Sequence, residues 1–150
     1  MIMKNLILVF ASLLISGMIS AQAINSDDIL GVWLNEDKDA HVEIYKEGDK
    51  YFGKIVWLKF PIDEETGKPK VDDENPDEDL RDQPVLGLVL LEDFVFDHDE
   101  WDSGTIYDPK NGKTYDCYME LKDDDNLKIR GYIGISLLGR TTYWTRVKED

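Results

Sequence analysis

The chain has 150 residues, a formal net charge of −15 and one cysteine. Such a charge should repel nucleic acid and anionic lipid surfaces, so neither is expected as a partner. A lone Cys117 excludes an intrachain disulfide, and the length fits one domain that must rely on its own hydrophobic core.

The first 23 residues match a secretory signal peptide. Lys4 precedes an apolar run, LILVFASLLI, and small and polar residues then lead to Ala21-Gln22-Ala23. A charged start, a short apolar run and an Ala-x-Ala exit are typical of a cleaved export signal, and the run is shorter than the ~20 residues of a bilayer span. We expect cleavage after Ala23, with Ala21 as the alternative. The mature domain, residues 24–150, is then periplasmic or secreted and has no membrane span.

The mature chain is dominated by short strand-like segments. Ser26 could cap a single helical turn at its start. Beyond it, alternating, β-branched and aromatic residues predict strands at 40–46, 51–60, 86–96, 103–108, 113–121, 126–135 and 140–147. Turn residues separate most of these segments, and no stretch has a helical period over three turns. The pattern predicts an all-β antiparallel barrel or sandwich.

Half of the acidic residues lie in two stretches. Residues 61–84 hold ten acids, three bases and four prolines, which predicts a long acidic loop without regular structure. Residues 92–102 hold six acids and no Lys or Arg, and His98 lies within them. A long loop of this kind is often functional, although a solvated loop that keeps the protein soluble explains the same composition.

The segment YDPKNGKTY, residues 107–115, has the residues of a tight turn. Pro109, Asn111 and Gly112 suit the backbone angles of a turn between two strands. A phosphate-binding loop would place its glycines before a helix, and no helix follows. Lys110 and Lys113 are therefore interpreted as turn and strand-start charges.

Alternation also assigns faces to two neighbouring strands. Tyr115, Cys117 and Met119 share one side of the first, and Ile129 and Ile133 share one side of the second. If the interior is open, these five side chains are the candidate lining of a pocket for an apolar ligand. Arg140, or Arg146, could meet a ligand carboxylate through a charge-assisted hydrogen bond.

Four segments of the chain together form a recognisable pattern. They are GVWLNEDKDAHVEIYKEGDKYFGKIVWLK, NPDEDLRDQPVLGL, GTIYDPKNGKTYDC and RGYIGISLLGRTTYWTRV. These segments resemble the secreted bacterial family catalogued as domain-of-unknown-function family 2147, whose members are similar to small lipocalin-like barrels. The resemblance implies an antiparallel calycin-type barrel and brings no activity. In calycins a Gly-x-Trp of the first strand packs beneath an Arg of a late strand, and here these positions are Gly31, Trp33 and Arg146. A stacked Arg would contribute roughly 0.5–2 kcal/mol as a structural contact.

No set of residues predicts catalysis, a metal or a cofactor. His41 and His98 are far apart, and no nucleophile motif such as Gly-x-Ser-x-Gly occurs. The acids of 97–102 could bind Ca²⁺ but lack the spacing and glycine of an EF-hand. Aromatic residues that could stack on sugars, or equally fill the barrel, are Trp57, Trp101, Tyr107, Tyr132, Tyr143 and Trp144.

Three classes of function therefore stay open. The first is a lipocalin-like barrel that binds a small apolar or amphipathic ligand without catalysis, because barrels of about eight strands can hold one small ligand. The second is a surface interaction or envelope-stress module with a filled core. Arg130 and Tyr132 share a predicted outward face and are the better candidates for an external site that stacks on a sugar. The third is a hydrolase that uses Asp79 and Asp82 near Arg81. An open apolar interior would favour the first class, and a filled interior would favour the second.

Overall fold

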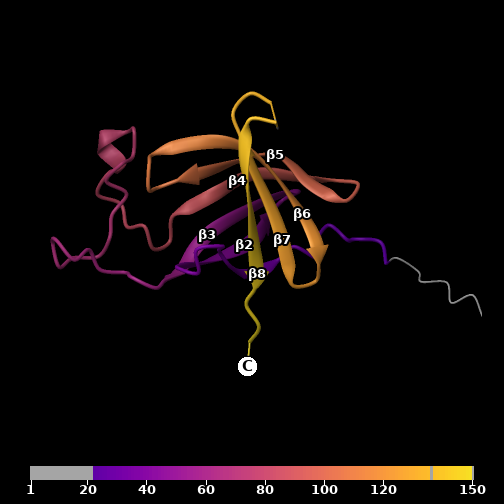
Figure 1. Ribbon diagram of the computed structural model, residues 1–150, viewed down its shortest axis with the longest axis horizontal. Helices are drawn as coiled ribbons and strands as arrows, with labels where there is room; N and C mark the ends of the chain where they lie inside the picture. Colours follow the sequence, from indigo (N-terminus) through magenta and orange to yellow (C-terminus); the bar gives the residue numbers. More distant parts are fainter. Residues whose placement is uncertain (1–21, 136, 150) are drawn as a thin grey trace, which may run out of the picture.

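Eight antiparallel strands close into one barrel (Figure 1). A computed structural model describes residues 22–135 and 137–149, so most of the predicted signal peptide lies outside the described residues. The strands are β1 (Gly31–Leu34), β2 (Ala40–Glu47), β3 (Lys50–Leu58), β4 (Val89–Asp97), β5 (Glu100–Asp108), β6 (Lys113–Asp123), β7 (Asn126–Tyr132) and β8 (Gly139–Arg146). Each pairs with the next, and β8 pairs with β1. The predicted all-β barrel is confirmed.

Three local predictions differ from the structure. The acidic segment between the strands predicted at 86–96 and 103–108 is mostly strand, because β4 extends to Asp97, turns tightly at His98, which has a φ of 59°, and continues as β5 from Glu100. β7 ends at Tyr132, and Ile133 follows outside the strand, because Gly134 turns the chain with a φ of 76°. The segment after Ser26 forms hydrogen-bonded turns and no helix.

Large aromatic side chains close one end of the barrel. Trp33, Tyr51, Phe94 and Trp101 are all fully buried there. Both buried indoles donate to the chain that precedes β1: Trp33 Nε1 to the Ile29 carbonyl at 2.9 Å, and Trp101 Nε1 to the Ser26 carbonyl at 3.1 Å. These bonds satisfy the polar atom of each ring and hold the N-terminal segment under this end of the barrel.

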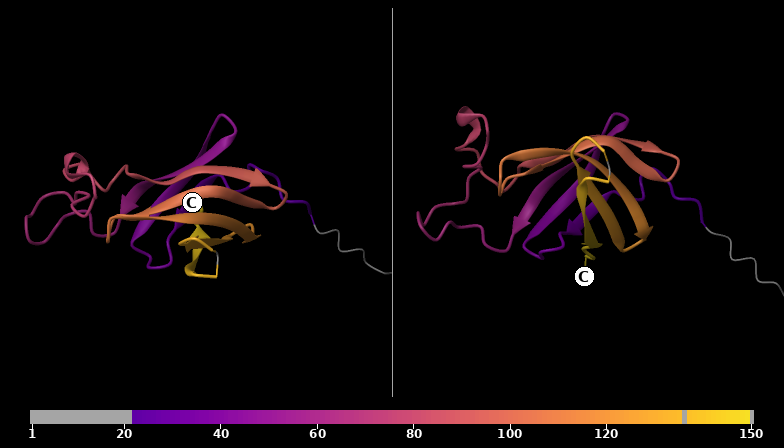
Figure 2. Two further views of the ribbon diagram at one scale, coloured as in Figure 1. Left: turned by 90° about the horizontal axis from the view of Figure 1, so that it is seen from above. Right: turned by 45° about the horizontal axis from the view of Figure 1, so that its top comes forward.

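The long acidic connection between β3 and β4 extends to one side of the barrel (Figures 1 and 2). It is better ordered than its composition predicts: it contains a short 3-10 helix, η1 (Glu78–Leu80), and two isolated bridges pair Ile62 with Pro69 and Val71 with Pro84. Its prolines still exclude a longer strand or helix. The loop thereby becomes a fixed wall beside the open end of the barrel.

Candidate functional site

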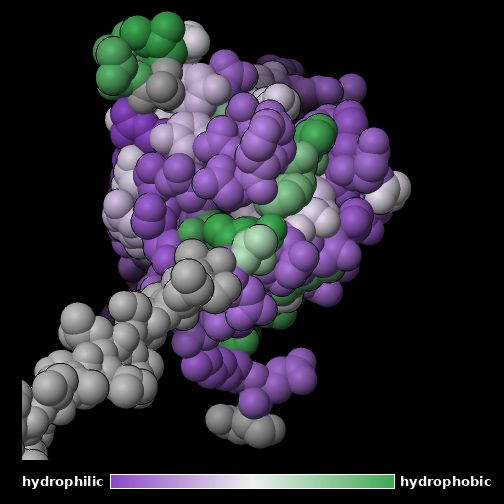
Figure 3. Space-filling view, turned by 90° about the vertical axis from the view of Figure 1, so that its right-hand side faces the viewer, coloured by the Kyte–Doolittle hydropathy of each residue, from purple (hydrophilic) through white to green (hydrophobic). Residues whose placement is uncertain are grey.

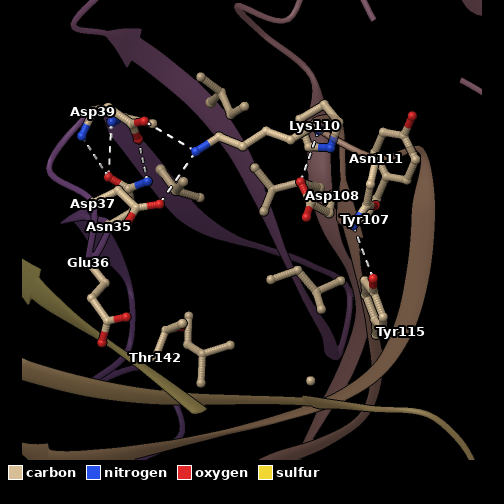
Figure 4. Close-up of a pocket in the computed structure, with 18 of the residues that line it drawn as sticks. Asn35, Glu36, Asp37, Asp39, Tyr107, Asp108, Lys110, Asn111, Tyr115 and Thr142 are labelled. Atoms are coloured by element: carbon tan, nitrogen blue, oxygen red, sulfur yellow. Dashed lines mark hydrogen bonds and ion pairs between the residues drawn. The ribbon is translucent and has the colours of Figure 1, made fainter. Parts of the chain in front are cut away.

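A cavity of about 760 Å³ opens at the end of the barrel opposite the buried aromatic residues (Figure 4). Its deeper wall consists of apolar side chains from six strands, and its mouth is formed by three connections and the acidic loop. The apolar wall includes Val42, Ile55, Leu90, Ile106, Ile129 and Trp144. A concave site with apolar walls and a few polar groups is the usual form of a small-molecule pocket.

Charged residues span the mouth of this cavity. Lys110, on the turn between β5 and β6, extends to the β1–β2 connection, where its Nζ lies 3.4 Å from Asp37 and 3.3 Å from Asp39 (Figure 4). Asn35 Nδ2 donates to Asp39 at 2.7 Å and fixes that carboxylate. On the other side of the mouth, Arg140 lies 3.7 Å from Glu36.

These contacts shift the pKa values of Asp39 and Lys110, the pair at the centre of the mouth. Burial alone would raise the pKa of Asp39, but the Asn35 hydrogen bond and the Lys110 charge lower it below its ordinary value. Burial likewise opposes the charge of Lys110, but the carboxylates of Asp39 and Asp37 raise its pKa above its ordinary value. Both groups are therefore charged at neutral pH.

A buried carboxylate fastens the acidic loop to the barrel wall. Asp72 is fully buried and accepts hydrogen bonds from the Tyr107 hydroxyl at 2.7 Å, Asn75 Nδ2 at 2.7 Å and Gln83 Nε2 at 3.1 Å. Burial and the neighbouring Asp72 carboxylate raise the pKa of Tyr107 to about 12, so its hydroxyl stays a donor. This network holds the loop in place as one side of the cavity mouth.

The turn predicted at residues 107–115 is confirmed, and the loop packs closely against it. The amides of Asn111 and Gly112 donate to the Asp108 carbonyl, and Gly112 has a φ of 69°. A Cβ at Gly112 would lie 1.9 Å from the Glu74 carbonyl oxygen. Glycine is therefore needed here both for the backbone angle and for the close approach of the loop.

The candidate ligand residues lie at different depths along the barrel. Tyr115 and Ile129 line the cavity, and Ile133 and Arg140 lie at its mouth. Ile133 is 65% exposed, so it is a rim residue rather than part of an inward strand face.

Cys117 and Met119, by contrast, are not among the residues that line the cavity. Both are buried nearer the closed end, where Met119 pairs with Trp101 of β5. The expectation that they line the pocket is therefore corrected, because alternation along a strand identifies the inward face and not the depth that large aromatics fill. Burial raises the pKa of the Cys117 thiol well above its ordinary value, so the thiolate is disfavoured.

The three positions expected to close the barrel lie together. The Arg146 guanidinium is 4.2 Å from the centroid of the Trp33 ring. It also donates to the carbonyl oxygens of Leu30 at 2.8 Å, Asp28 at 2.7 Å and Asp124 at 2.6 Å. Gly31 has a φ of 124°, and a Cβ there would lie 3.1 Å from an Arg146 nitrogen.

The other candidate residues make separate contacts. Arg81 donates to the Asn75 carbonyl and pairs with Glu78 rather than with Asp79 or Asp82. The rings of His41 and Trp57 lie 4.4 Å apart in contact with each other. In the part of the chain that the structure describes, no group of three or more His, Cys, Asp or Glu residues is arranged to hold a metal ion.

The aromatic candidates do not gather into one exposed platform. Trp101 is fully buried at the closed end, whereas Tyr107, Tyr132 and Trp144 line the cavity or its mouth. Trp57 of β3 and Tyr143 of β8 are about half exposed. Arg130 donates to the Thr141 hydroxyl at 3.0 Å, and the Tyr132 ring lies 6.4 Å from that of Tyr118.

Across residues 22–135 and 137–149 no helix has the length and apolar character that a membrane span requires.

An exposed apolar projection adjoins the cavity mouth. The connection between β7 and β8 carries Ile133, Ile135, Leu137 and Leu138, each between 57% and 83% exposed. Figure 3 shows this projection in green at the upper left, above a largely hydrophilic surface. Ile133 and Leu138 also line the cavity, so the projection is continuous with its wall.

Comparisons with known proteins agree with this fold. The solved structure of protein HP1028 from the human pathogen Helicobacter pylori, described as belonging to the lipocalin family, matches with a TM-score of 0.70 at 21% identity, over 80% of this chain and 83% of that chain. At this identity the likeness shows the fold alone. No curated protein matches the chain. The model of family DUF2147, described as an uncharacterized protein conserved in bacteria, matches residues 31–146. The chain therefore belongs to the DUF2147 family and has a lipocalin-like barrel.

Proposed function

We propose that this protein binds one small apolar or amphipathic ligand inside its barrel, in the periplasm or after secretion, without catalysing a reaction. The cavity carries this proposal. Its apolar wall offers burial to a hydrocarbon or aromatic group, which contributes roughly 25 cal/mol per Å² of apolar surface removed from water. Its charged groups lie at the mouth, where the polar end of an amphipathic ligand would stay in contact with water.

The proposed location rests on the N-terminal sequence. Residues 1–23 have the composition of a cleaved export signal, and the single cysteine is buried and so needs no reducing environment to stay unpaired. The mature chain from residue 24 begins just before the segment that packs under the closed end of the barrel. Removal of the signal would therefore leave the fold intact.

Native mass spectrometry of protein recovered from the envelope of the producing bacterium tests both parts of the proposal. We expect a chain that starts at Gln22 or Ile24 and carries one small adduct, which denaturation releases. The denatured chain analysed in parallel gives the mass of the protein alone. A chain that retains Met1 would contradict export, and a native mass equal to the denatured mass, with no uptake of apolar fluorophores, would contradict ligand binding.

The apolar projection favours a second candidate function, a module that contacts another protein through its surface. Four exposed aliphatic side chains on one connection are unusual on a surface that is otherwise strongly charged. In the same native spectra this function would give an adduct of protein size. Replacing Leu137, which is 83% exposed, with serine should remove that adduct without affecting a small ligand.

A further inference from the structure

The lining of the cavity carries more negative than positive charge. The charged residues of the lining all lie at the mouth. Six acidic residues contribute to the lining against three basic ones. The acidic residues are Glu36, Asp37, Asp39, Asp63, Asp73 and Asp108, and the basic residues are Lys70, Lys110 and Arg140. The net charge of the whole protein, −15, has the same sign as the excess at the mouth.

The basic residues of the mouth already have partners. Arg140 faces Glu36 at 3.7 Å, and Lys70 Nζ lies over the Phe60 ring, 5.9 Å from its centroid. Lys110 is held by the two carboxylates of the β1–β2 connection. A ligand carboxylate at the mouth would have to compete with these groups and would meet the excess of acids, so Arg140 is a poor anchor for it.

Lys110 also shows which charge the mouth accommodates. Its ammonium lies between Asp37 and Asp39 at the edge of the cavity (Figure 4), at the end of a flexible side chain that is 67% exposed. Exposed ion pairs of this kind are weak, so a second ammonium can exchange with the first at small cost. The Asn35 hydrogen bond keeps Asp39 in place when Lys110 leaves.

We propose that the cavity selects ligands that join an apolar tail to a positively charged ammonium head, with the tail against the apolar wall and the head between Asp37 and Asp39 in place of Lys110. This inference rests on the proposed ligand-binding function and names its ligand class. The tail supplies most of the affinity through burial, as in other apolar pockets. The charge of the head determines which of two ligands with the same tail the cavity prefers.

Displacement of the neutral fluorophore N-phenyl-1-naphthylamine from the mature protein tests this selectivity. Dodecylamine, which is protonated at neutral pH, and dodecanoate share one tail and differ in the sign of the head. We expect dodecylamine to displace the fluorophore at a concentration lower by roughly 1.5- to fivefold, since exposed ion pairs contribute about 0.2–1 kcal/mol. Added salt should reduce this difference.

Two variants at the mouth, each with a matched control elsewhere, separate the effect of the local charges from the effect of the net charge of the protein. Lys110→Met removes the internal ammonium and should raise the affinity for dodecylamine by roughly two- to fivefold, and Asp37→Asn should lower it by a similar factor. Lys122→Met and Asp99→Asn change the net charge equally at exposed positions away from the cavity lining, and should change neither affinity.

The outcomes distinguish the two levels of the proposal. If the fluorophore does not bind, the proposed function fails. If it binds but dodecanoate displaces it as well as dodecylamine does, ligand binding stands and the ammonium selectivity is wrong. Equal effects of Asp37→Asn and Asp99→Asn would also overturn it, because the preference would then follow the net charge rather than the mouth.

Discussion

Replacing Arg146 with alanine is expected to lower the free energy of unfolding by about 2–4 kcal/mol. The change removes the contact with the Trp33 ring and leaves three backbone carbonyls, of Asp28, Leu30 and Asp124, without their charged donor. These carbonyls belong to the N-terminal segment and to the β6–β7 turn, so one side chain joins two parts of the closed end. Urea denaturation followed by tryptophan fluorescence measures the loss.

Two further replacements show whether the geometry of the guanidinium matters. Arg146→Lys keeps the charge but has no planar fork to reach three carbonyls, so it should restore little stability. Arg140→Ala removes an arginine that is 75% exposed and should change the free energy of unfolding by no more than ~0.5 kcal/mol. A denaturation midpoint for Arg146→Ala equal to that of Arg140→Ala would contradict the assigned role in closure.

Replacing Asp72 with alanine is expected to destabilise the protein by about 2–4 kcal/mol and to release the acidic loop. The buried carboxylate accepts from Tyr107, Asn75 and Gln83, and its removal leaves these donors without a partner. Asp73→Ala is the matched control, because Asp73 is exposed. Limited proteolysis within residues 61–84 should become faster in Asp72→Ala alone, and equal rates in both variants would show that the network does not hold the loop.

The sequence predicted the fold well because the relevant patterns are local. Period-two alternation in residues 113–121 and 126–135, and the turn residues between the strands, predict an antiparallel barrel or sandwich without knowledge of distant contacts. The positions of Gly31, Trp33 and Arg146 came instead from resemblance to a family. No local pattern would have joined residues more than 110 positions apart.

The site was less predictable because it depends on depth and on contacts between distant segments. Tyr115 and Met119 share one inward face, yet only Tyr115 reaches the cavity, since Trp33, Phe94 and Trp101 fill the closed end around Met119. Lys110 was interpreted as a plain turn charge, and its partners lie more than 70 positions earlier in the chain. Asp72 is one acid among many in its loop, and only the fold reveals that it is buried.

Fluorescence titration of N-phenyl-1-naphthylamine into three forms of the mature protein tests the central claim, an open ligand-binding cavity above a packed core, most directly. The forms are the wild type, Thr142→Trp and Met119→Trp. Thr142 lines the cavity, so an indole there should weaken binding by roughly tenfold or more, with little loss of stability. Met119 is fully buried in the core, so its replacement should cost ~1–3 kcal/mol by overpacking and leave binding intact. Saturable binding by the wild type that only Thr142→Trp removes is the predicted result. Absence of saturable binding, or binding that Thr142→Trp leaves unchanged, would contradict the account.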